Sequence, residues 1–338
     1  MSWAIWITGP PGSGKSTLAR LAAERLAAVG APVRVLELDR LRAVLTPQPT
    51  YSDAERDVVY RALVFMAQAL TGAGQPVIID ATGHRRQWRD LARVSIDRFV
   101  EVQLDCPREI CVAREETRPC GFAPRHIYAG AGRPGATVPG VDVPYERALT
   151  ADLVIDTASV APDVAIDRVA ALGLGLERSA RARRPAGRGA VIWLTGLPGS
   201  GKTTLASRLA EALTADGVPV TILEWLALRA TVLAQPCPSP ATLELAHRAL
   251  ACAAAELAAA GFVVVVDATA PRRAWRELGR ALVDRFAEVQ LVCPRDVCAE
   301  RERAVRWRPC PGAHGHGQAA AEWAADYEYA VNPDLIVD

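Results

Sequence analysis

Two stretches of this chain, residues 3–20 and 191–208, carry nearly the same sequence. The first reads WAIWITGPPGSGKSTLAR and the second reads VIWLTGLPGSGKTTLASR. The same order of landmarks follows in each half, so that VIIDAT at 77–82 is matched by VVVDAT at 264–269. The repeat is far longer than the roughly 20–50 residues of a solenoid unit, so each copy is expected to be a domain of its own. We interpret the chain as the product of a gene duplication.

The segment between the two copies differs from both in composition. Residues 173–189 are rich in Arg, Gly and Ala and contain Pro185, which is typical of a linker. The two domains are accordingly expected at 1–172 and 190–338. The arginines of the linker either bind an acidic partner or are exposed to solvent. We favour solvent exposure, because a basic linker needs no partner to account for its composition.

Each half alternates short apolar runs with longer amphipathic segments. In the first half the apolar runs lie at 4–8, 33–38, 77–80, 100–104 and 153–156. Strands that alternate with helices favour a parallel sheet with helices on both faces. The predicted fold class is α/β, with two tandem P-loop NTPase domains of the kinase type, each a parallel five-stranded sheet flanked by helices.

The first apolar run of each half leads into a Walker A sequence. Residues 9–16 read GPPGSGKS and residues 196–203 read GLPGSGKT, each between a predicted strand and a predicted helix. Glycines let consecutive backbone N–H groups surround phosphates, and the helix N-terminus adds positive potential. The first half is therefore predicted to bind ATP and Mg²⁺, and the loop alone predicts a nucleotide in the second half as well.

The side chains of this loop have expected roles. Lys15 is expected to contact the β- and γ-phosphates, and the Ser16 hydroxyl is expected to bind Mg²⁺. The predicted nucleotide-binding residues are Gly9, Gly12, Ser13, Gly14, Lys15, Ser16 and Thr17 in the first half, and Gly196, Gly199, Ser200, Gly201, Lys202, Thr203 and Thr204 in the second.

Charge and hydropathy argue against several other classes of protein. The net charge is +1, which gives no broad attraction to nucleic acid or to an anionic membrane. No apolar run has the length needed to span a bilayer, and the N-terminus lacks the pattern of a signal peptide. We expect a cytoplasmic protein that acts on a small-molecule substrate, with neither long nucleic acid nor membrane as a partner. A homodimer and an intramolecular pairing of the two domains both stay open.

The segments after the third and fourth predicted strands favour a small-molecule kinase. No Asn/Thr-Lys-x-Asp segment of a GTPase is present. Arg114, Arg118 and Arg125 lie in a stretch that commonly forms a lid, where cationic donors stabilise the charge of the transferring phosphoryl group. Asp80 ends the third predicted strand and is a candidate for organising the water shell of Mg²⁺. The alternative for Asp80 is a buried structural cap.

Four segments give the first half a resemblance to the adenylylsulfate kinase family, which phosphorylates the 3′-hydroxyl of adenosine 5′-phosphosulfate (APS). The family's Leu-Asp-Gly-Asp-x-x-Arg corresponds to LELDRLR at 36–42, and its Phe-Ser-x-x-Asp-Arg-x-x-Asn-x-Arg corresponds to YSDAERDVVYR at 51–61. A Leu-Tyr pair and a Pro-Tyr-Glu in the family's lid correspond to IY at 127–128 and PYE at 144–146.

The resemblance implies roles for the residues that match. Asp39 is the implied base or hydroxyl-positioning group. Arg42, Arg56 and Arg61 are implied to hold the anionic group of the acceptor, and Tyr128 is implied to bind the substrate from the lid. The implied reaction is the ATP-dependent phosphorylation of APS in sulfate assimilation. Together with the loop, the candidate catalytic residues are Lys15, Asp39, Asp80 and Arg114.

Two positions depart from the family pattern and leave the acceptor open. Val59 stands where the family has Asn, and the third predicted strand ends in Asp-Ala-Thr at 80–82 in place of Ser-Pro. That ending is similar to polynucleotide-kinase-like enzymes. The alternatives are therefore a P-loop kinase of another small-molecule or nucleic-acid-end hydroxyl, and a non-enzymatic ATP-binding regulatory module.

The second half is predicted to be degenerate. Aligning Lys15 with Lys202 places Leu226 opposite Asp39, and leucine can neither accept a proton nor bind the water of a metal ion. The segment 241–245 offers no counterpart of the arginine at position 56. We interpret this half as retained for nucleotide sensing or for domain pairing.

A loop with Cys310, His314 and His316 has residue types that bind metals. Its glycines fit a flexible connection equally well, so Mg²⁺ at Ser16 is the metal that the sequence predicts.

Overall fold

The computed structural model divides into two compact units, residues 1–184 and 185–338. It describes residues 2–118, 121–124, 126–133, 135–177, 185, 187–233, 238–306 and 327–338, with the backbone alone for 304–306.

Five parallel strands form the sheet of the first unit. They are β1 (Ala4–Thr8), β2 (Arg34–Glu37), β3 (Val77–Asp80), β4 (Phe99–Asp105) and β5 (Leu153–Asp156). Their order is β2-β3-β1-β4-β5, so that β1 lies in the centre and pairs with β3 and β4. Every residue of β1 and β3 is buried, as expected for a parallel sheet that is covered on both faces. The predicted fold of this half is confirmed.

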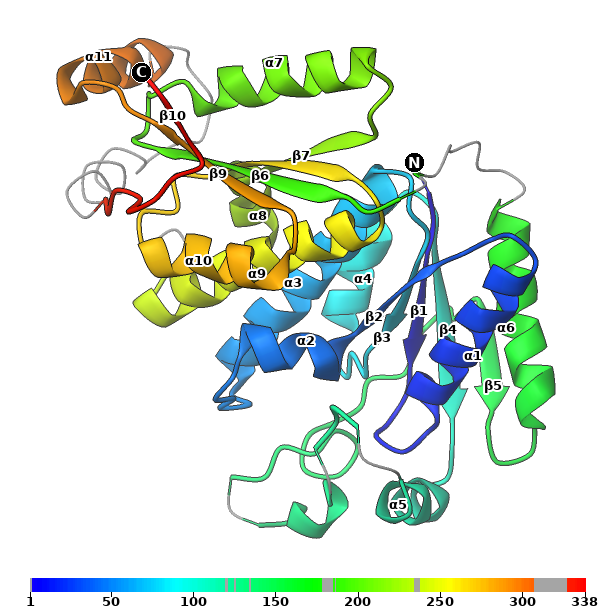
Figure 1. Cartoon of the computed structure of the whole chain (residues 1–338). Helices are drawn as coiled ribbons and strands as arrows, with labels where there is room; N and C mark the ends of the chain where they lie inside the picture. The colour runs from blue at the N-terminus through cyan, green and yellow to red at the C-terminus, as the bar shows by residue number, and fades with distance from the viewer. Residues whose placement is uncertain are drawn as a thin grey trace. The chain divides into compact units, whose positions relative to one another are not determined.

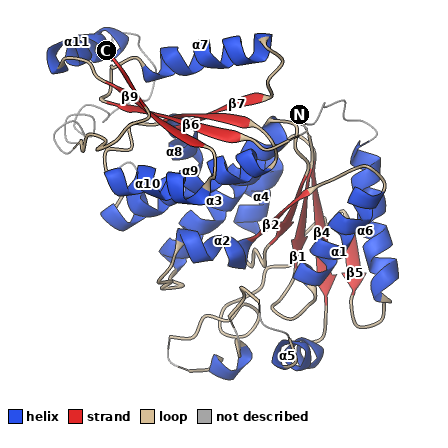
Figure 2. Cartoon of the chain, in the orientation of Figure 1, coloured by secondary structure: helices blue, strands red, loops and turns tan. Residues whose placement is uncertain are grey.

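Helices cover both faces of this sheet (Figure 2). The helices of this unit are α1 (Lys15–Ala28), α2 (Leu38–Leu45), α3 (Asp53–Gly72), α4 (Arg86–Ser95), α5 (Arg108–Glu116) and α6 (Pro162–Glu177). α1 and α6 lie side by side on one face (Figure 1), where Leu18, Leu26 and Ile166 belong to one apolar cluster with Ile5 and Ile7 of β1. α3 and α4 pack against each other and contact β3 and β4 respectively.

The second unit repeats this architecture. Its strands are β6 (Ala190–Gly196), β7 (Val220–Glu224), β8 (Val263–Asp267), β9 (Phe286–Leu291) and β10 (Leu335–Val337), in the order β7-β8-β6-β9-β10. Its helices are α7 (Lys202–Ala215), α8 (Trp225–Val232), α9 (Pro240–Ala259), α10 (Arg273–Leu282) and α11 (Arg295–Arg306). The order of strands corresponds to that of the first unit, strand for strand. The prediction of a second parallel five-stranded sheet is therefore confirmed.

The segment expected to be a linker begins as helix. α6 continues to Glu177 because Leu174 and Leu176 pack against the core of the first unit, and the Trp3 indole Nε1 donates a hydrogen bond to Glu177 at 2.9 Å. The division between the two units falls after residue 184, within the expected linker.

Among the described helices, none combines the length and the apolar composition needed to cross a membrane.

Candidate active site of the first unit

A cavity of ≈ 810 Å³ lies at the carboxyl ends of the strands in the first unit. Its lining comes from the segment that follows each strand: the Walker A loop after β1, α2 after β2, residues 80–84 at the end of β3, α5 after β4, and residues 157–166 after β5. Parts of α3 and of residues 123–139 complete it. Ligands of parallel α/β sheets bind at this edge.

The Walker A loop depends on glycines at positions where a side chain has no room. Gly12 has φ +76°, and a Cβ added to it would lie 2.2 Å from the carbonyl oxygen of Cys111 in α5. Gly14 caps α1 with φ +97°, a left-handed conformation that favours glycine. Residues 11–18 of this loop and helix line the cavity, so the N-terminal end of α1 is open to an anionic group. Within the described part of the chain, the buried Ser13 hydroxyl has no hydrogen-bond partner.

Lys15 is a buried cation at this end of the cavity. Its Nζ donates to the carbonyl oxygen of Pro10 at 2.9 Å. Burial lowers the pKa of Lys15, while the carboxylates of Asp80 and Asp39 act in the opposite direction. The ammonium group therefore lies where two acidic side chains also act on it, and its contact with phosphates stays a prediction.

Asp80 ends β3 and forms a hydroxyl–carboxylate pair with Ser16. Burial raises the pKa of Asp80 to about 6, although Lys15 and a hydrogen bond from Ser16 act to lower it. Two hard oxygen donors beside a phosphate-binding loop suit Mg²⁺, which binds carboxylates and phosphates. The residues present therefore fit the ion that the sequence predicts at Ser16. The pair is compatible with the Walker B interpretation of Asp80 and with that of a buried structural cap.

Cationic and aromatic side chains line another part of the cavity. Asp39 and Arg42 come from α2, where Asp39 is near enough to act on the pKa values of Lys15 and Asp80, and Arg42 Nη1 lies 3.2 Å from Glu55 Oε1. Tyr51 adopts φ +53°, and its ring centroid lies 5.0 Å from Cζ of Arg42 and 5.9 Å from Cζ of Arg56. A tyrosine in the left-handed region is strained, and such strain is commonly found at ligand-binding positions.

Arg56 connects this part of the cavity to the segment over it. Its Nη2 donates to the carbonyl oxygen and to Oγ1 of Thr137, at 2.8 and 2.7 Å. Asp39, Arg42 and Arg56, which the sequence analysis had grouped around the acceptor, therefore all line one cavity with Lys15 and Asp80.

Two residues from the same group are not in the lining. Arg61 follows Arg56 by five positions in α3, which rotates its side chain by about 140° around the helix axis. Its Nε donates to Asp57 Oδ2 at 2.7 Å. Tyr128 begins a short 3₁₀ helix (Tyr128–Gly130), and its Oη donates to the carbonyl oxygen of Pro11 at 2.7 Å. The structure thus places Tyr128 against the Walker A loop and Arg61 on another face of α3.

Two of the lid arginines line the cavity at its nucleotide end. Arg114 donates to the carbonyl oxygen and to the hydroxyl of Thr157, at 2.7 and 3.1 Å. Arg118 donates to the carbonyl oxygen of Pro124 at 2.5 Å. Arg125 lies outside the described residues, as does the loop with Cys310, His314 and His316. The described residues contain no group of three or more His, Cys, Asp or Glu side chains that could hold a metal ion.

A residue that the sequence analysis did not single out also lines the cavity. His84 lies four positions after Asp80, in the segment that leads from β3 to α4. Its position beyond the carboxyl end of a strand was the signal that could have identified it.

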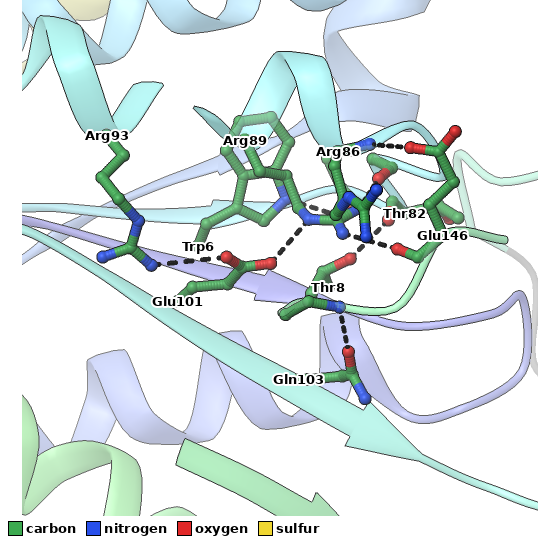
Figure 3. A network of polar contacts seen from close by, with 12 residues as sticks. Trp6, Thr8, Thr82, Arg86, Arg89, Arg93, Glu101, Gln103 and Glu146 are labelled. Carbon is green, nitrogen blue, oxygen red and sulfur yellow. Dashed lines mark hydrogen bonds and ion pairs between the residues drawn. The ribbon is translucent and has the colours of Figure 1, made fainter. Parts of the chain in front are cut away.

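A buried ion pair fixes the segment that carries His84. Arg89 Nε lies 2.6 Å from Glu101 Oε1 of β4, and Arg89 also donates to the carbonyl oxygens of Gly83 and Glu146. Figure 3 shows Arg89 between Glu101 and Glu146, with the main chain of Arg86 bonded to the Glu146 carboxylate. The segment after β3 is thereby attached to the sheet and to the chain that follows the lid.

The second unit retains the phosphate-binding features. Gly199 and Gly201 have φ +80° and +97°, close to their counterparts in the first unit. Lys202 is buried, which lowers its pKa to about 8, and donates to the carbonyl oxygens of Gly196 and Leu197 at 3.0 and 2.9 Å. Thr203 Oγ1 donates to Asp267 Oδ2 at 2.6 Å.

The acceptor end of the second unit is different. Leu226, which occupies the position of Asp39, is 69% exposed. Trp225 takes the position of Leu38 and stacks on His247 at 4.1 Å between ring centroids, and His247 stacks on Trp275 at 3.7 Å. The corresponding residues of the first unit are Leu38, Tyr60 and Trp88, of which Tyr60 and Trp88 also stack, with centroids 4.0 Å apart. The ring that the second unit adds is therefore that of Trp225.

A family model matches both halves of the chain. The model of the family described as adenylylsulphate kinase matches residues 1–156 and 188–338. The probable adenylyl-sulfate kinase of Archaeoglobus fulgidus is 37% identical over 160 residues, which cover 46% of this chain and 97% of the relative. The adenylyl-sulfate kinase of Synechococcus sp. (strain JA-3-3Ab) is 36% identical over 165 residues, which cover 49% of this chain and 90% of the relative.

A solved structure of this kind is similar as well. It is the Mycobacterium tuberculosis APS kinase in complex with AMPPNP and APS, which is 30% identical to this chain with a TM-score of 0.45. The match covers 51% of this chain and 96% of that one.

Proposed function

Because the chain belongs to the adenylylsulphate kinase family, we propose that its first unit transfers the γ-phosphoryl group of ATP to the 3′-hydroxyl of APS. The observation that supports this most is the common lining of one cavity. Lys15 and Asp80 line it with the Walker A loop, Arg42 and Arg56 line it around Tyr51, and Asp39 is near enough to act on Lys15 and Asp80. The cavity thus offers groups for a polyphosphate, for a hydroxyl and for an anionic acceptor.

The residues at the nucleotide end have complementary roles in this proposal. The Walker A loop and Lys15 hold the phosphates, and Arg114 and Arg118 add donors where negative charge develops during transfer. Apolar side chains of Val160, Ala165 and Ile166 line the cavity beside them and suit a base. Ser16 and Asp80 would hold Mg²⁺, which neutralises charge on the phosphates when it is bound.

The acceptor end supplies the hydroxyl and its orientation. Arg42 and Arg56 orient the acceptor by its phosphosulfate, because guanidinium groups match tetrahedral oxyanions well. Asp39 accepts the proton of the attacking hydroxyl while the new O–P bond forms and the bond to the leaving ADP breaks. Most of the rate enhancement then comes from positioning and electrostatics, as is usual for phosphoryl transfer.

One observation favours a different acceptor as the second candidate. Val59, at the position where the family has Asn, is fully buried in α3 and does not line the cavity. Valine cannot make the hydrogen bonds of an amide to the residues around it, so the cavity wall here is supported differently, and lost polar contacts in a site can cost orders of magnitude in discrimination. A kinase of another anionic small molecule with a free hydroxyl is therefore the alternative.

We further propose that the second unit binds a nucleotide but transfers no phosphoryl group. Its loop glycines, Lys202 and the Thr203–Asp267 pair resemble those of the first unit. Its acceptor side has Leu226 in place of the carboxylate and the stacked rings of Trp225, His247 and Trp275.

The acceptor is tested by coupled ADP release with a panel of substrates. APS is compared with nucleosides, sugars, hydroxy-amino acids and 5′-hydroxyl oligonucleotides at equal ATP. ADP release that depends on APS supports the proposal. Release with another member of the panel but none with saturating APS would replace APS with that acceptor and leave the kinase activity standing.

A further inference from the structure

Two buried nitrogen atoms of residues that line the cavity have no hydrogen-bond partner in the described part of the chain. They are Nη1 of Arg56 and Nδ1 of His84. Arg56 is 6% exposed and His84 is 2% exposed, and both residues line the cavity. Buried polar atoms are nearly always hydrogen-bonded. Two such atoms without a partner in the lining of a cavity indicate that a ligand in the cavity supplies the missing partner.

The imidazole of His84 is held in place by its surroundings. Its ring packs edge-on against Trp88 and Tyr60, with centroids 5.0 and 6.3 Å apart. Its carbonyl oxygen accepts a hydrogen bond from the backbone N–H of Glu146 at 2.8 Å, and the neighbouring N–H of Gly83 donates to Tyr60 Oη at 3.1 Å. These contacts hold the backbone of His84 and restrict the movement of its ring.

The second unit shows that this turn does not require a histidine. There the backbone N–H of Glu328 donates to the carbonyl oxygen of Pro271 at 2.9 Å, in the same way that Glu146 donates to His84. Arg276 holds the flanking carbonyl oxygens of Ala270 and Glu328, both at 2.6 Å. Pro271 and Leu243 thus occupy the positions of His84 and Arg56 on an equivalent scaffold.

The charges around His84 keep it neutral at physiological pH. Burial and the guanidinium groups of Arg56 and Arg85 lower its pKa to about 4, although the carboxylates of Asp53 and Glu146 act to raise it. Arg56 is the charged group with the largest effect on His84. A neutral imidazole can donate from Nδ1 to an oxygen atom that Arg56 attracts by its charge.

We propose that Nδ1 of His84 and Nη1 of Arg56 together bind one oxygen of the acceptor's oxyanion, which makes His84 a specificity-determining residue. The identity of the acceptor as APS rests on the proposed function, whereas the class of ligand, a sulfate or phosphate group, follows from the two nitrogen donors. The second unit, which has neither donor, would not bind such a group at the equivalent place.

The direct test is ¹⁵N NMR of the full chain labelled in its histidines, with the His84 signal assigned from a His84→Asn variant. Sodium sulfate and APS are the two probes, and sodium chloride at matched ionic strength is the control. We expect the Nδ1 resonance of His84 to shift with both probes and not with chloride. An unchanged resonance at saturating sulfate and at saturating APS overturns the inference.

Kinetics with a matched pair of variants gives the second readout. Asn retains an N–H donor near the position of Nδ1, whereas Leu fills similar space without one. We expect His84→Leu to raise the KM for the acceptor about tenfold or more, with kcat and the KM for ATP little changed, and His84→Asn to recover most of that loss. Equal acceptor KM values in both variants and the wild type contradict the inference.

The two readouts separate this inference from the proposed function. If the wild type does not turn over APS, the proposed acceptor is wrong, and the response of His84 to sulfate still decides the inference. If the wild type turns over APS while His84 shows no response to either probe, the proposed function stands and the inference fails.

Discussion

Arg89 and Glu101 form a buried ion pair, with Nε of the arginine 2.6 Å from Oε1 of the glutamate. Arg276 and Glu288 form the same pair in the second unit, also at 2.6 Å. Arg89 also bonds to the segment that carries His84, and Arg276 bonds in the same way to the segment that carries Pro271. In each unit the arginine thus connects a central strand to the segment that follows the third strand.

Breaking this pair is expected to destabilise one unit at a time. Arg89→Met leaves the buried Glu101 without its principal partner, and removing one member of a buried pair costs about 3–5 kcal/mol. Arg276→Met is the matched variant in the second unit. Urea unfolding followed by circular dichroism should show each variant shifting a different part of the transition. Unfolding curves that coincide with the wild type for both variants would show that the pair contributes little.

The two Walker A lysines are expected to differ in importance. Lys15→Ala should reduce turnover by on the order of a thousandfold, because it removes a cation from a site whose catalysis is largely electrostatic. Lys202→Ala should leave most of the turnover intact, since Leu226 offers no carboxylate to the second unit. Both purified variants are assayed side by side for ADP release. If Lys202→Ala alone abolishes turnover in a folded protein, the second unit is catalytic or is coupled to the first.

Asp80 is expected to make the free protein less stable as the pH rises. The pKa of Asp80 is about 6 in the folded chain and has the ordinary value of 3.8 in the unfolded chain. Between these two pH values the carboxyl group is protonated in the folded state and ionised in the unfolded state. Stability should therefore fall through this window and stay level above it. Asp80→Asn should lose this dependence and be more stable at pH 7, by at most about 3 kcal/mol. Urea unfolding at several pH values measures both effects.

The same variant should lose phosphoryl transfer, because asparagine lacks the charge that the phosphate-bound ion needs. An Asp80→Asn protein that is no more stable than the wild type at pH 7 would show that burial of the carboxylate has little cost. One that turns over normally would support the structural-cap interpretation of Asp80.

Nucleotide binding is expected in both units. Isothermal titration with AMPPNP and Mg²⁺ should give two sites per wild-type chain and one site in each single variant, Lys15→Ala and Lys202→Ala, because each lysine contacts the phosphates of its own loop. If the wild type binds one AMPPNP per chain and Lys202→Ala still binds one, the second unit has a role that does not involve a nucleotide.

The parts of the molecule that could be predicted from the sequence are those with local patterns. The alternation of strands and helices and the Walker A loops gave the fold of both units, and the end of β3 marked Asp80. Arg61 illustrates the limit, because its spacing from Arg56 along α3 turns it toward Asp57 and out of the cavity lining. The position of His84 just beyond β3 could have identified it, whereas the Arg89–Glu101 pair depends on how α4 packs on β4, for which no local pattern exists.

The most direct test of the proposed function is to identify the product that the protein makes from ATP and APS. The purified full chain is incubated with both substrates and Mg²⁺, and the products are resolved by ³¹P NMR and mass spectrometry, with Lys15→Ala as the control. We predict that ADP and APS carrying a new phosphate on its 3′-oxygen appear in equal amounts, and that the control forms neither. ADP formed without any phosphorylated APS, in a protein that transfers phosphate to another acceptor, would contradict the assignment.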